Sequence, residues 1–93
     1  MTNKFALHVE TFQYWYDNFE AVSFDVEDEG RDEIKILLHK LINAKDIDQK
    51  EIELLYMLAL DNTIGQKSDF IKFQAKKIVN FLNSDILKNI IKE

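Results

Sequence analysis

The stretch RDEIKILLHKLINAKDIDQKEIELLYMLAL, residues 31–60, predicts two helices joined by a short polar break. In its first part, residues 34–42, apolar side chains recur every three or four positions, which is the period of an amphipathic helix. In its second part, Asp48 followed by Glu51 is typical of a capping box at the start of a helix. Seven consecutive apolar residues, 54–60, make this second helix apolar nearly all round, so we expect it to be central.

A first helix with an aromatic face is expected from about Asn3 to Glu20. Its inward residues are spaced by four and three positions, and they are Phe5, Val9, Phe12, Tyr16 and Phe19. Residues 5–9 also fit the alternation of a strand, but the helical period covers a longer segment. Residues 22–30 then alternate between apolar and polar before an acidic run, and we expect a loop there, with a short edge strand as the alternative.

Two more helices are expected after a polar break at residues 61–65. Ser68 is a candidate N-cap for the fourth helix, and Ser84 is a candidate N-cap for a short fifth helix. The inward stripe of the fourth helix is expected to be Ile71, Phe73, Ile78, Phe81 and Leu82. Because proline is absent and glycine occurs at only two positions, we predict an all-α fold. It is expected to be a single domain, residues 1–93, built as a compact bundle of about five helices, with HEAT-like packing of helix pairs left open.

The formal charge of −5 is distributed unevenly along the chain. Residues 1–33 carry nine carboxylates against two basic side chains, while residues 34–93 carry ten lysines against eight carboxylates. The acidic first third argues against nucleic-acid binding through that part of the chain and favours a basic partner, or simply solubility. No apolar run approaches the roughly 20 residues that cross a bilayer, and the start of the chain does not resemble a secretory signal. We therefore expect a cytoplasmic protein without a membrane partner.

The sequence offers no catalytic or metal-binding motif, so we expect a protein that is not an enzyme and has no cofactor. Cysteine is absent, which excludes a disulfide, a thiol nucleophile and a thiolate zinc site. The two histidines, His8 and His39, lie at no recognisable spacing from a nucleophile and are expected to be ordinary helix residues. An EF-hand loop beginning at Asp25 would have Gly30 at its sixth position, but Ile36 would stand where the closing glutamate is required.

Two short stretches indicate a protein-binding surface. FDVEDEGRDE, residues 24–33, has six carboxylates around one arginine, and QYWYDNFE, residues 13–20, has three consecutive aromatic residues that one helical stripe cannot all bury. Tyrosine and tryptophan often anchor interfaces, and neighbouring carboxylates would steer a basic partner. The candidate partner-binding residues are Tyr14, Trp15, Asp17, Glu20, Asp25, Glu27, Asp28, Glu29, Asp32 and Glu33. The alternative is that the rings pack internally and the carboxylates form a solvated loop.

With these two stretches on a small cysteine-free helical chain, the protein resembles the small acidic immunity proteins that bacteria make against nuclease toxins of the colicin or contact-dependent inhibition type. The resemblance implies a non-enzymatic inhibitor whose acidic surface covers the basic surface of a cognate toxin. Because immunity families have unrelated folds, it implies nothing about the fold.

Three alternatives remain open. A small regulator resembling a helix-turn-helix protein would use the lysines of the fourth helix, Lys67, Lys72, Lys76 and Lys77. The net acidity of the chain and the absence of arginine from that helix argue against this nucleic-acid partner. A phage-encoded inhibitor that imitates DNA would share the physics of an immunity protein. A homodimer through the first helix would also explain exposed aromatic rings.

Overall fold

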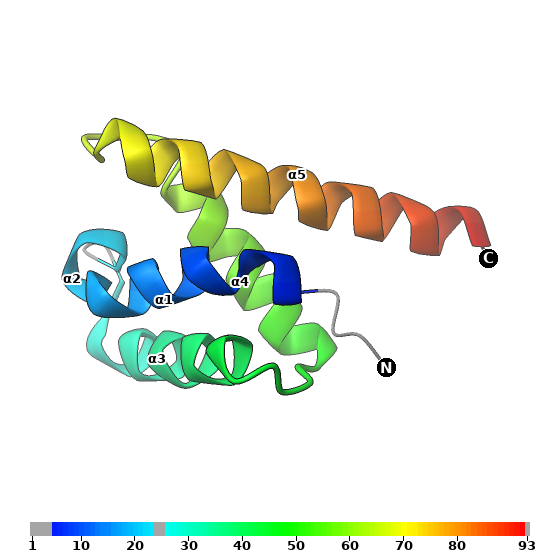
Figure 1. Cartoon of the computed structure of the whole chain (residues 1–93), viewed down its shortest axis with the longest axis horizontal. Helices are drawn as coiled ribbons and strands as arrows, with labels where there is room; N and C mark the ends of the chain where they lie inside the picture. Colours follow the sequence, from blue (N-terminus) through cyan, green and yellow to red (C-terminus); the bar gives the residue numbers. More distant parts are fainter. Residues whose placement is uncertain (1–4, 24–25, 93) are drawn as a thin grey trace. The chain divides into compact units, whose positions relative to one another are not determined.

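The computed structural model describes residues 5–23 and 26–92, with side chains described up to Ser84. In this part of the chain every regular element is helical (Figure 1): the 3-10 helix η1 (Ala6–His8), α1 (Val9–Asp17), α2 (Phe19–Val22), α3 (Asp28–Ile42), α4 (Gln49–Asp61) and α5 (Asp69–Lys92). The predicted all-α fold class is therefore confirmed. The chain divides into two compact units, Met1–Leu55 and Tyr56–Glu93, whose boundary lies inside α4. The expectation of a single domain stays a prediction.

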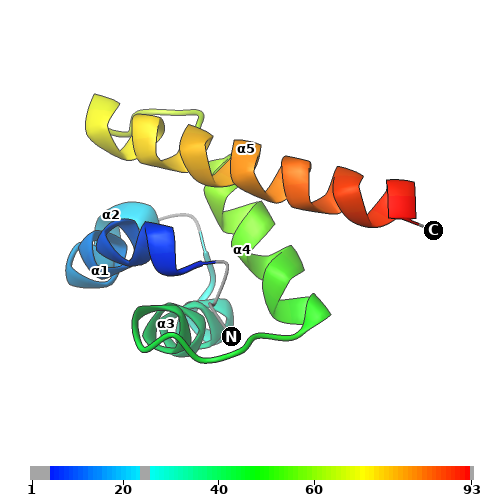
Figure 2. The same cartoon turned by 45° about the vertical axis from the view of Figure 1, so that its right-hand side comes forward.

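In the first unit, α1 packs against α3, and Figures 1 and 2 show the two helices alongside each other. From α1, Phe12 and Trp15 are completely buried, with their rings edge to face and their centroids 6.2 Å apart. Phe5 is also buried and meets Phe12 edge to face at 6.3 Å. The inner side of α3 is fully apolar and consists of Ile34, Leu37, Leu38 and Leu41. These side chains make α3 a helix with one buried side and one side in solvent.

The first helix differs from the predicted one in its length and in its inward side. It ends at Asp17, because the backbone of Asn18 leaves the helical conformation, with φ of −115° and ψ of 41°, and the side-chain Nδ2 of Asn18 donates to the Tyr14 carbonyl at 2.9 Å. A separate short helix, α2, starts at Phe19. Trp15 is buried where Tyr16 was expected, and Tyr16 is only half-buried. Buried tyrosine and buried tryptophan each need a partner for one polar group, and tryptophan contributes the larger apolar surface, which favours Trp15 inside.

The second predicted helix is confirmed as α3, but it begins at Asp28 instead of Arg31. Gly30 therefore lies in its first turn and does not belong to the expected loop. Phe24 and Asp25, within that loop, lie outside the described residues. The early start is consistent with the carboxylates of Asp28 and Glu29, since negative charge is favourable near the positive end of a helix dipole.

The turn between α3 and α4 is held by hydrogen bonds at both helix ends. After α3, the N–H of Lys45 donates to the Lys40 carbonyl at 2.9 Å and that of Ala44 donates to the Leu41 carbonyl at 3.3 Å, which is a Schellman motif. Ala44 adopts a left-handed conformation there, with φ of 55°. At the start of α4 the predicted capping box is confirmed: Glu51 N–H donates to Asp48 Oδ1 at 2.8 Å, and Asp48 N–H donates to Glu51 Oε1 at 3.1 Å.

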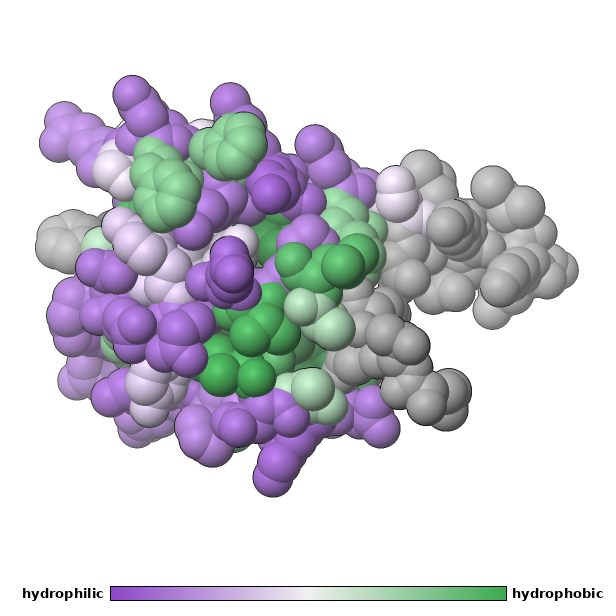
Figure 3. All heavy atoms as spheres, viewed as in Figure 1, coloured by the Kyte–Doolittle hydropathy of each residue, from purple (hydrophilic) through white to green (hydrophobic). Residues whose placement is uncertain are grey.

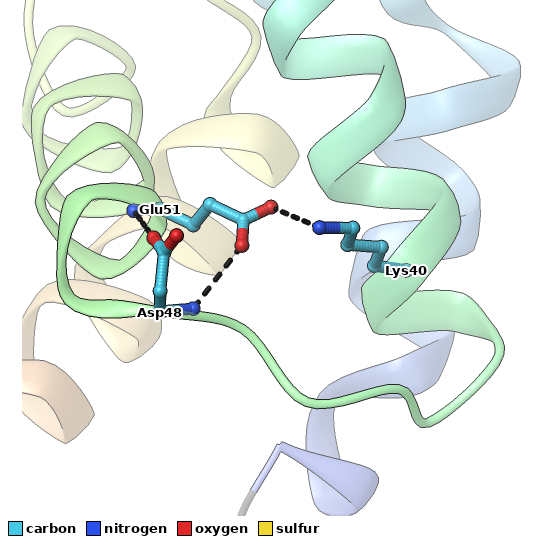
Figure 4. A network of polar contacts seen from close by, with 3 residues as sticks. All are labelled: Lys40, Asp48 and Glu51. Atoms are coloured by element: carbon cyan, nitrogen blue, oxygen red, sulfur yellow. Dashed lines mark hydrogen bonds and ion pairs between the residues drawn. The ribbon is translucent and has the colours of Figure 1, made fainter.

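The capping box is also joined to α3. The second carboxylate oxygen of Glu51 lies 2.9 Å from the ammonium nitrogen of Lys40, as Figure 4 shows. Glu51 thus uses one oxygen to close its own helix start and the other to pair with the last turn of α3. This arrangement fixes where α4 begins relative to α3 within the first unit.

The second unit contains the last part of α4 and the whole of α5. The predicted N-cap is confirmed, because Ile71 N–H donates to the Ser68 hydroxyl at 3.2 Å. Two other predictions are wrong. α5 continues through Ser84 to Lys92, so Ser84 does not start a fifth helix, and Phe73 is exposed instead of buried. The buried stripe of α5 is Ile71, Gln74, Ala75, Ile78 and Leu82. Among the described residues, no helix combines the length and the apolar character needed to cross a membrane.

Candidate functional site

The carboxylates predicted to bind a partner are concentrated on the first two turns of α3. Glu27 precedes the helix in an extended conformation, Asp28 and Glu29 are in the first turn, and Asp32 and Glu33 follow one turn later. All five side chains are exposed. Within the part of the chain that the structure describes, none of the five is in an ion pair. Their charges are therefore available to another molecule.

Glu20 is placed differently from these carboxylates. It pairs with Arg31, whose guanidinium lies 5.7 Å from the centroid of the Phe19 ring. The ammonium of Lys35 approaches the same ring at 5.5 Å. The two cations, both from α3, therefore contact the first residue of α2 and join the two helices, and the charge of Glu20 is already matched within the chain. The structure gives Glu20 a role in joining α2 to α3.

The aromatic residues of the predicted site, Tyr14 and Trp15, are less exposed than its carboxylates on α3. Trp15 has no exposed area, so contact with a partner would require the indole to leave the core of the first unit, and its assignment to the site stays a prediction. Tyr14 is half-buried on the same helix. Asp17 is exposed, and its carboxylate accepts a hydrogen bond of 3.0 Å from the Gln13 amide. Asp25, the remaining candidate, lies outside the described residues.

Ile36 was not predicted as a site residue, yet it lies on the same side of α3 as the carboxylates. Its side chain is 59% exposed, and it follows Asp32 by four positions and Glu33 by three, so the three are neighbours on the helix surface. We call Glu29, Asp32, Glu33 and Ile36 the α3 outer face. Helical geometry could have identified Ile36, because a residue two positions from the buried Ile34 points away from the core.

The described residues contain no group of three or more His, Asp or Glu side chains placed to hold a metal ion. The segment compared with an EF-hand loop is helical from Asp28 onward, so its oxygens are displayed outward instead of converging. The two histidines are both in aromatic contacts. His8 meets the Phe12 ring at 6.4 Å, and His39 lies 6.4 Å from the Tyr16 ring.

The two units of the chain differ in net charge. Met1–Leu55 has thirteen carboxylates and six basic residues, whereas Tyr56–Glu93 has four carboxylates and six basic residues.

Comparisons with protein-family models, with curated proteins and with solved structures found no match. Function is therefore inferred from the chemistry of the surface.

Proposed function

We propose that the protein is a non-enzymatic inhibitor that binds a basic protein through the α3 outer face, in the manner of an immunity protein that neutralises a nuclease toxin. The observation that supports this most is that side chains of like charge are neighbours on the surface of α3. Asp28 and Asp32, and Glu29 and Glu33, are four positions apart on an exposed helix surface. Each such pair destabilises a helix by about 0.2–0.5 kcal/mol. A partner that supplies positive charge would remove this repulsion.

Stabilisation of the helix start does not account for the whole group. Asp28 and Glu29 are in the first turn, where the helix dipole favours negative charge. Asp32 and Glu33 lie a turn later, where that effect has largely gone. The second pair of carboxylates thus adds repulsion without a compensating contact among the described residues, and an intermolecular role is the physical explanation that we favour.

The same surface has the features of a binding site for a basic protein. Exposed carboxylates of one sign raise the rate at which an oppositely charged partner arrives, and salt reduces that rate. Ile36 supplies an apolar contact among them, and α3 is held rigid by its buried inner side, which lowers the entropic cost of binding. Binding is therefore expected to be fast and salt-sensitive, and to occlude a basic surface without any chemical step.

The experiment is a comparison of two charge-reversed proteins as bait in a lysate of the native cells. In the first, Glu29, Asp32 and Glu33 are replaced by lysine. In the control, Glu10→Lys, Asp46→Lys and Glu53→Lys make the same change in net charge at exposed positions elsewhere in the first unit.

The wild-type protein and the control should retain a basic protein in a one-to-one ratio at low salt and release it at high salt. The α3 variant should lose it, with an association rate lower by at least tenfold. Equal retention by the two variants would refute the proposal. Once the bound protein is purified, an assay for nuclease activity with and without this chain tests the more specific part, inhibition of a toxin.

A further inference from the structure

Two phenylalanine rings on the first turns of α5 lie at the surface of the second unit. Phe70 is 53% exposed and Phe73 is 61% exposed, and their spacing of three positions puts them on the same side of the helix. Figure 3 shows hydrophobic side chains standing out among hydrophilic ones over the beginning of α5. Exposed aromatic side chains that cluster in this way are typical of surfaces that bind another macromolecule.

Basic side chains flank the two rings. Lys77 follows Phe73 by one turn, and its ammonium lies 5.5 Å from the centroid of that ring. Lys76 is also exposed and follows Phe73 by three positions. Asp69, in the first turn of α5, offsets one of these positive charges. We call Phe70, Phe73, Lys76 and Lys77 the α5 outer face.

A partner for the α5 outer face must offer an apolar side chain to the rings and carboxylates to the lysines. The α3 outer face has both, since Ile36 is exposed beside Asp32 and Glu33 on a rigid helix. The two faces also have similar spacing, because each presents its residues at intervals of three and four along a helix, and such rows can interdigitate. The charges of the two units, acidic for Met1–Leu55 and basic for Tyr56–Glu93, favour the same pairing.

We propose that the α5 outer face binds the α3 outer face of a second copy of this chain. The contact is heterologous, since one copy contributes the basic aromatic helix and the other contributes the acidic one. It is strengthened at low salt, because the charges at its edge are exposed and screened by ions. Self-association covers the α3 outer face, so a basic partner and a second copy compete for the same carboxylates.

The test is sedimentation velocity of the full chain over a range of concentrations at low and high salt, with two complementary variants. The α3 variant carries Glu29→Lys, Asp32→Lys and Glu33→Lys. The α5 variant carries Lys76→Glu and Lys77→Glu, and Lys45→Glu with Lys50→Glu is the matched control at exposed positions elsewhere. Each outer-face variant alone has like charges on both faces, whereas a mixture of the two again has opposite charges at each contact.

The wild type and the control should associate as concentration rises, each outer-face variant should remain monomeric, and the equimolar mixture should associate again. Phe70→Ala with Phe73→Ala should weaken association by about tenfold or more, because aromatic anchors contribute most of the binding energy of an interface. Circular dichroism confirms that each variant is folded. A wild type that is monomeric at every concentration, or a mixture that fails to associate, overturns the proposal.

Two further measurements distinguish self-association from the inhibitor function and from nucleic-acid binding. The α5 variant should keep its capture of the basic protein while losing self-association, so that failure of the inhibitor function and failure of the self-association are distinguishable. A fluorescent single-stranded oligonucleotide tests the other occupant that aromatic rings and lysines could bind. Salt-sensitive binding of that oligonucleotide, lost in Phe70→Ala with Phe73→Ala while the wild type stays monomeric, would reassign the face to nucleic acid.

Discussion

Gly30 lies directly against Val26, and a Cβ atom added at Gly30 would come within 2.8 Å of Val26 Cγ1. Val26 directly precedes Glu27, the N-cap residue of α3. The backbone N–H of Val26 donates to the Ser23 carbonyl at 3.0 Å. Its branched side chain has few rotamers with which to move aside. Glycine in a helix costs about 1 kcal/mol relative to alanine, so this close approach is the physical reason for a glycine inside α3.

Gly30→Ala should therefore destabilise the protein, although alanine is the better helix former. Overpacking costs about 1–3 kcal/mol, which exceeds the gain of about 1 kcal/mol in helix propensity. Urea unfolding followed by circular dichroism measures the difference. Val26→Ala removes the atom that a Cβ at Gly30 would meet. In a Val26→Ala protein, adding Gly30→Ala should therefore cost little or no stability relative to Val26→Ala alone. A Gly30→Ala protein more stable than the wild type would contradict this account of the contact.

Ala44→Gly should stabilise the protein by up to about 1 kcal/mol. Ala44 has a φ of 55°, and a left-handed conformation costs a residue with a side chain about 1–2 kcal/mol. Part of the gain is lost because glycine increases the entropy of the unfolded chain. The change keeps the hydrogen bonds of the Schellman motif, which involve the backbone only. Thermal unfolding should show a higher midpoint.

The control for this prediction is the same substitution in a helix. Ala21 lies in α2 and is exposed, and Ala21→Gly should destabilise by about 0.5–1 kcal/mol. The two alanine-to-glycine changes are thus expected to have opposite signs. If both lowered stability by the same amount, the left-handed strain at Ala44 would not be a significant contribution.

The sequence predicts the helices that carry strong local signals. The period of the apolar residues identifies α3, and the Asp48 and Glu51 pair identifies the start of α4, because both signals depend on contacts within a few residues. Local signals do not decide which residue is buried where two sides of a helix are similarly apolar. With Phe5 and Phe12 inside, either Trp15 or Tyr16 can complete the stripe, and only the tertiary packing of the first unit selects Trp15.

The errors in α5 have a different cause. Phe73 was expected inside because it is apolar, but it lies two positions from the buried Ile71 and so points to the other side of the helix. Ser84 was expected to start a new helix, yet a serine caps a helix only where the chain changes direction, and neither proline nor glycine occurs beyond Gly65. Of the candidate site, the carboxylates on α3 could be identified from sequence. Ile36 and the Phe70–Phe73 pair needed strict helical geometry.

Trp15→Phe should leave binding of a basic partner unchanged while lowering stability. Trp15 is the only tryptophan of the chain and is completely buried, so its fluorescence reports the core of the first unit. The loss should be smaller than the roughly 3–5 kcal/mol that removal of a whole aromatic ring costs. Titration of the wild-type protein with the captured basic protein should leave the emission maximum of Trp15 in place, and the Trp15→Phe variant provides the background emission of the partner.

Ile36→Ala is the counterpart of Trp15→Phe, because its side chain is exposed instead of buried. We expect it to weaken partner binding several-fold while changing stability by less than about 0.5 kcal/mol, as is usual for surface positions. For each variant, the quantity to compare is the change in partner affinity relative to the change in the free energy of unfolding. If Trp15→Phe weakened binding more than Ile36→Ala at equal folded fraction, the contact surface would have to be moved from α3 to α1.

Glu51 performs two functions that can be separated by two substitutions. Glu51→Ala removes both the acceptor for the Asp48 N–H and the pair with Lys40, and it should cost about 1 kcal/mol or slightly more. Glu51→Gln keeps an acceptor for the N–H and removes only the charge, so it should cost about half as much, because side chains exposed by 38% and 20% leave the pair partly screened. Glu53→Ala, on the exposed side of α4, is the control.

Salt distinguishes the two contributions of Glu51. High salt screens the pair with Lys40, so the cost of Glu51→Gln should shrink as ionic strength rises. The hydrogen bond to Asp48 is local and far less sensitive to salt, so Glu51→Ala should remain more costly than Glu51→Gln at every ionic strength. Urea unfolding of both variants at low and high salt measures this. If the two variants converged at high salt, the ion pair alone, and not the capping box, would be what holds the start of α4 beside α3.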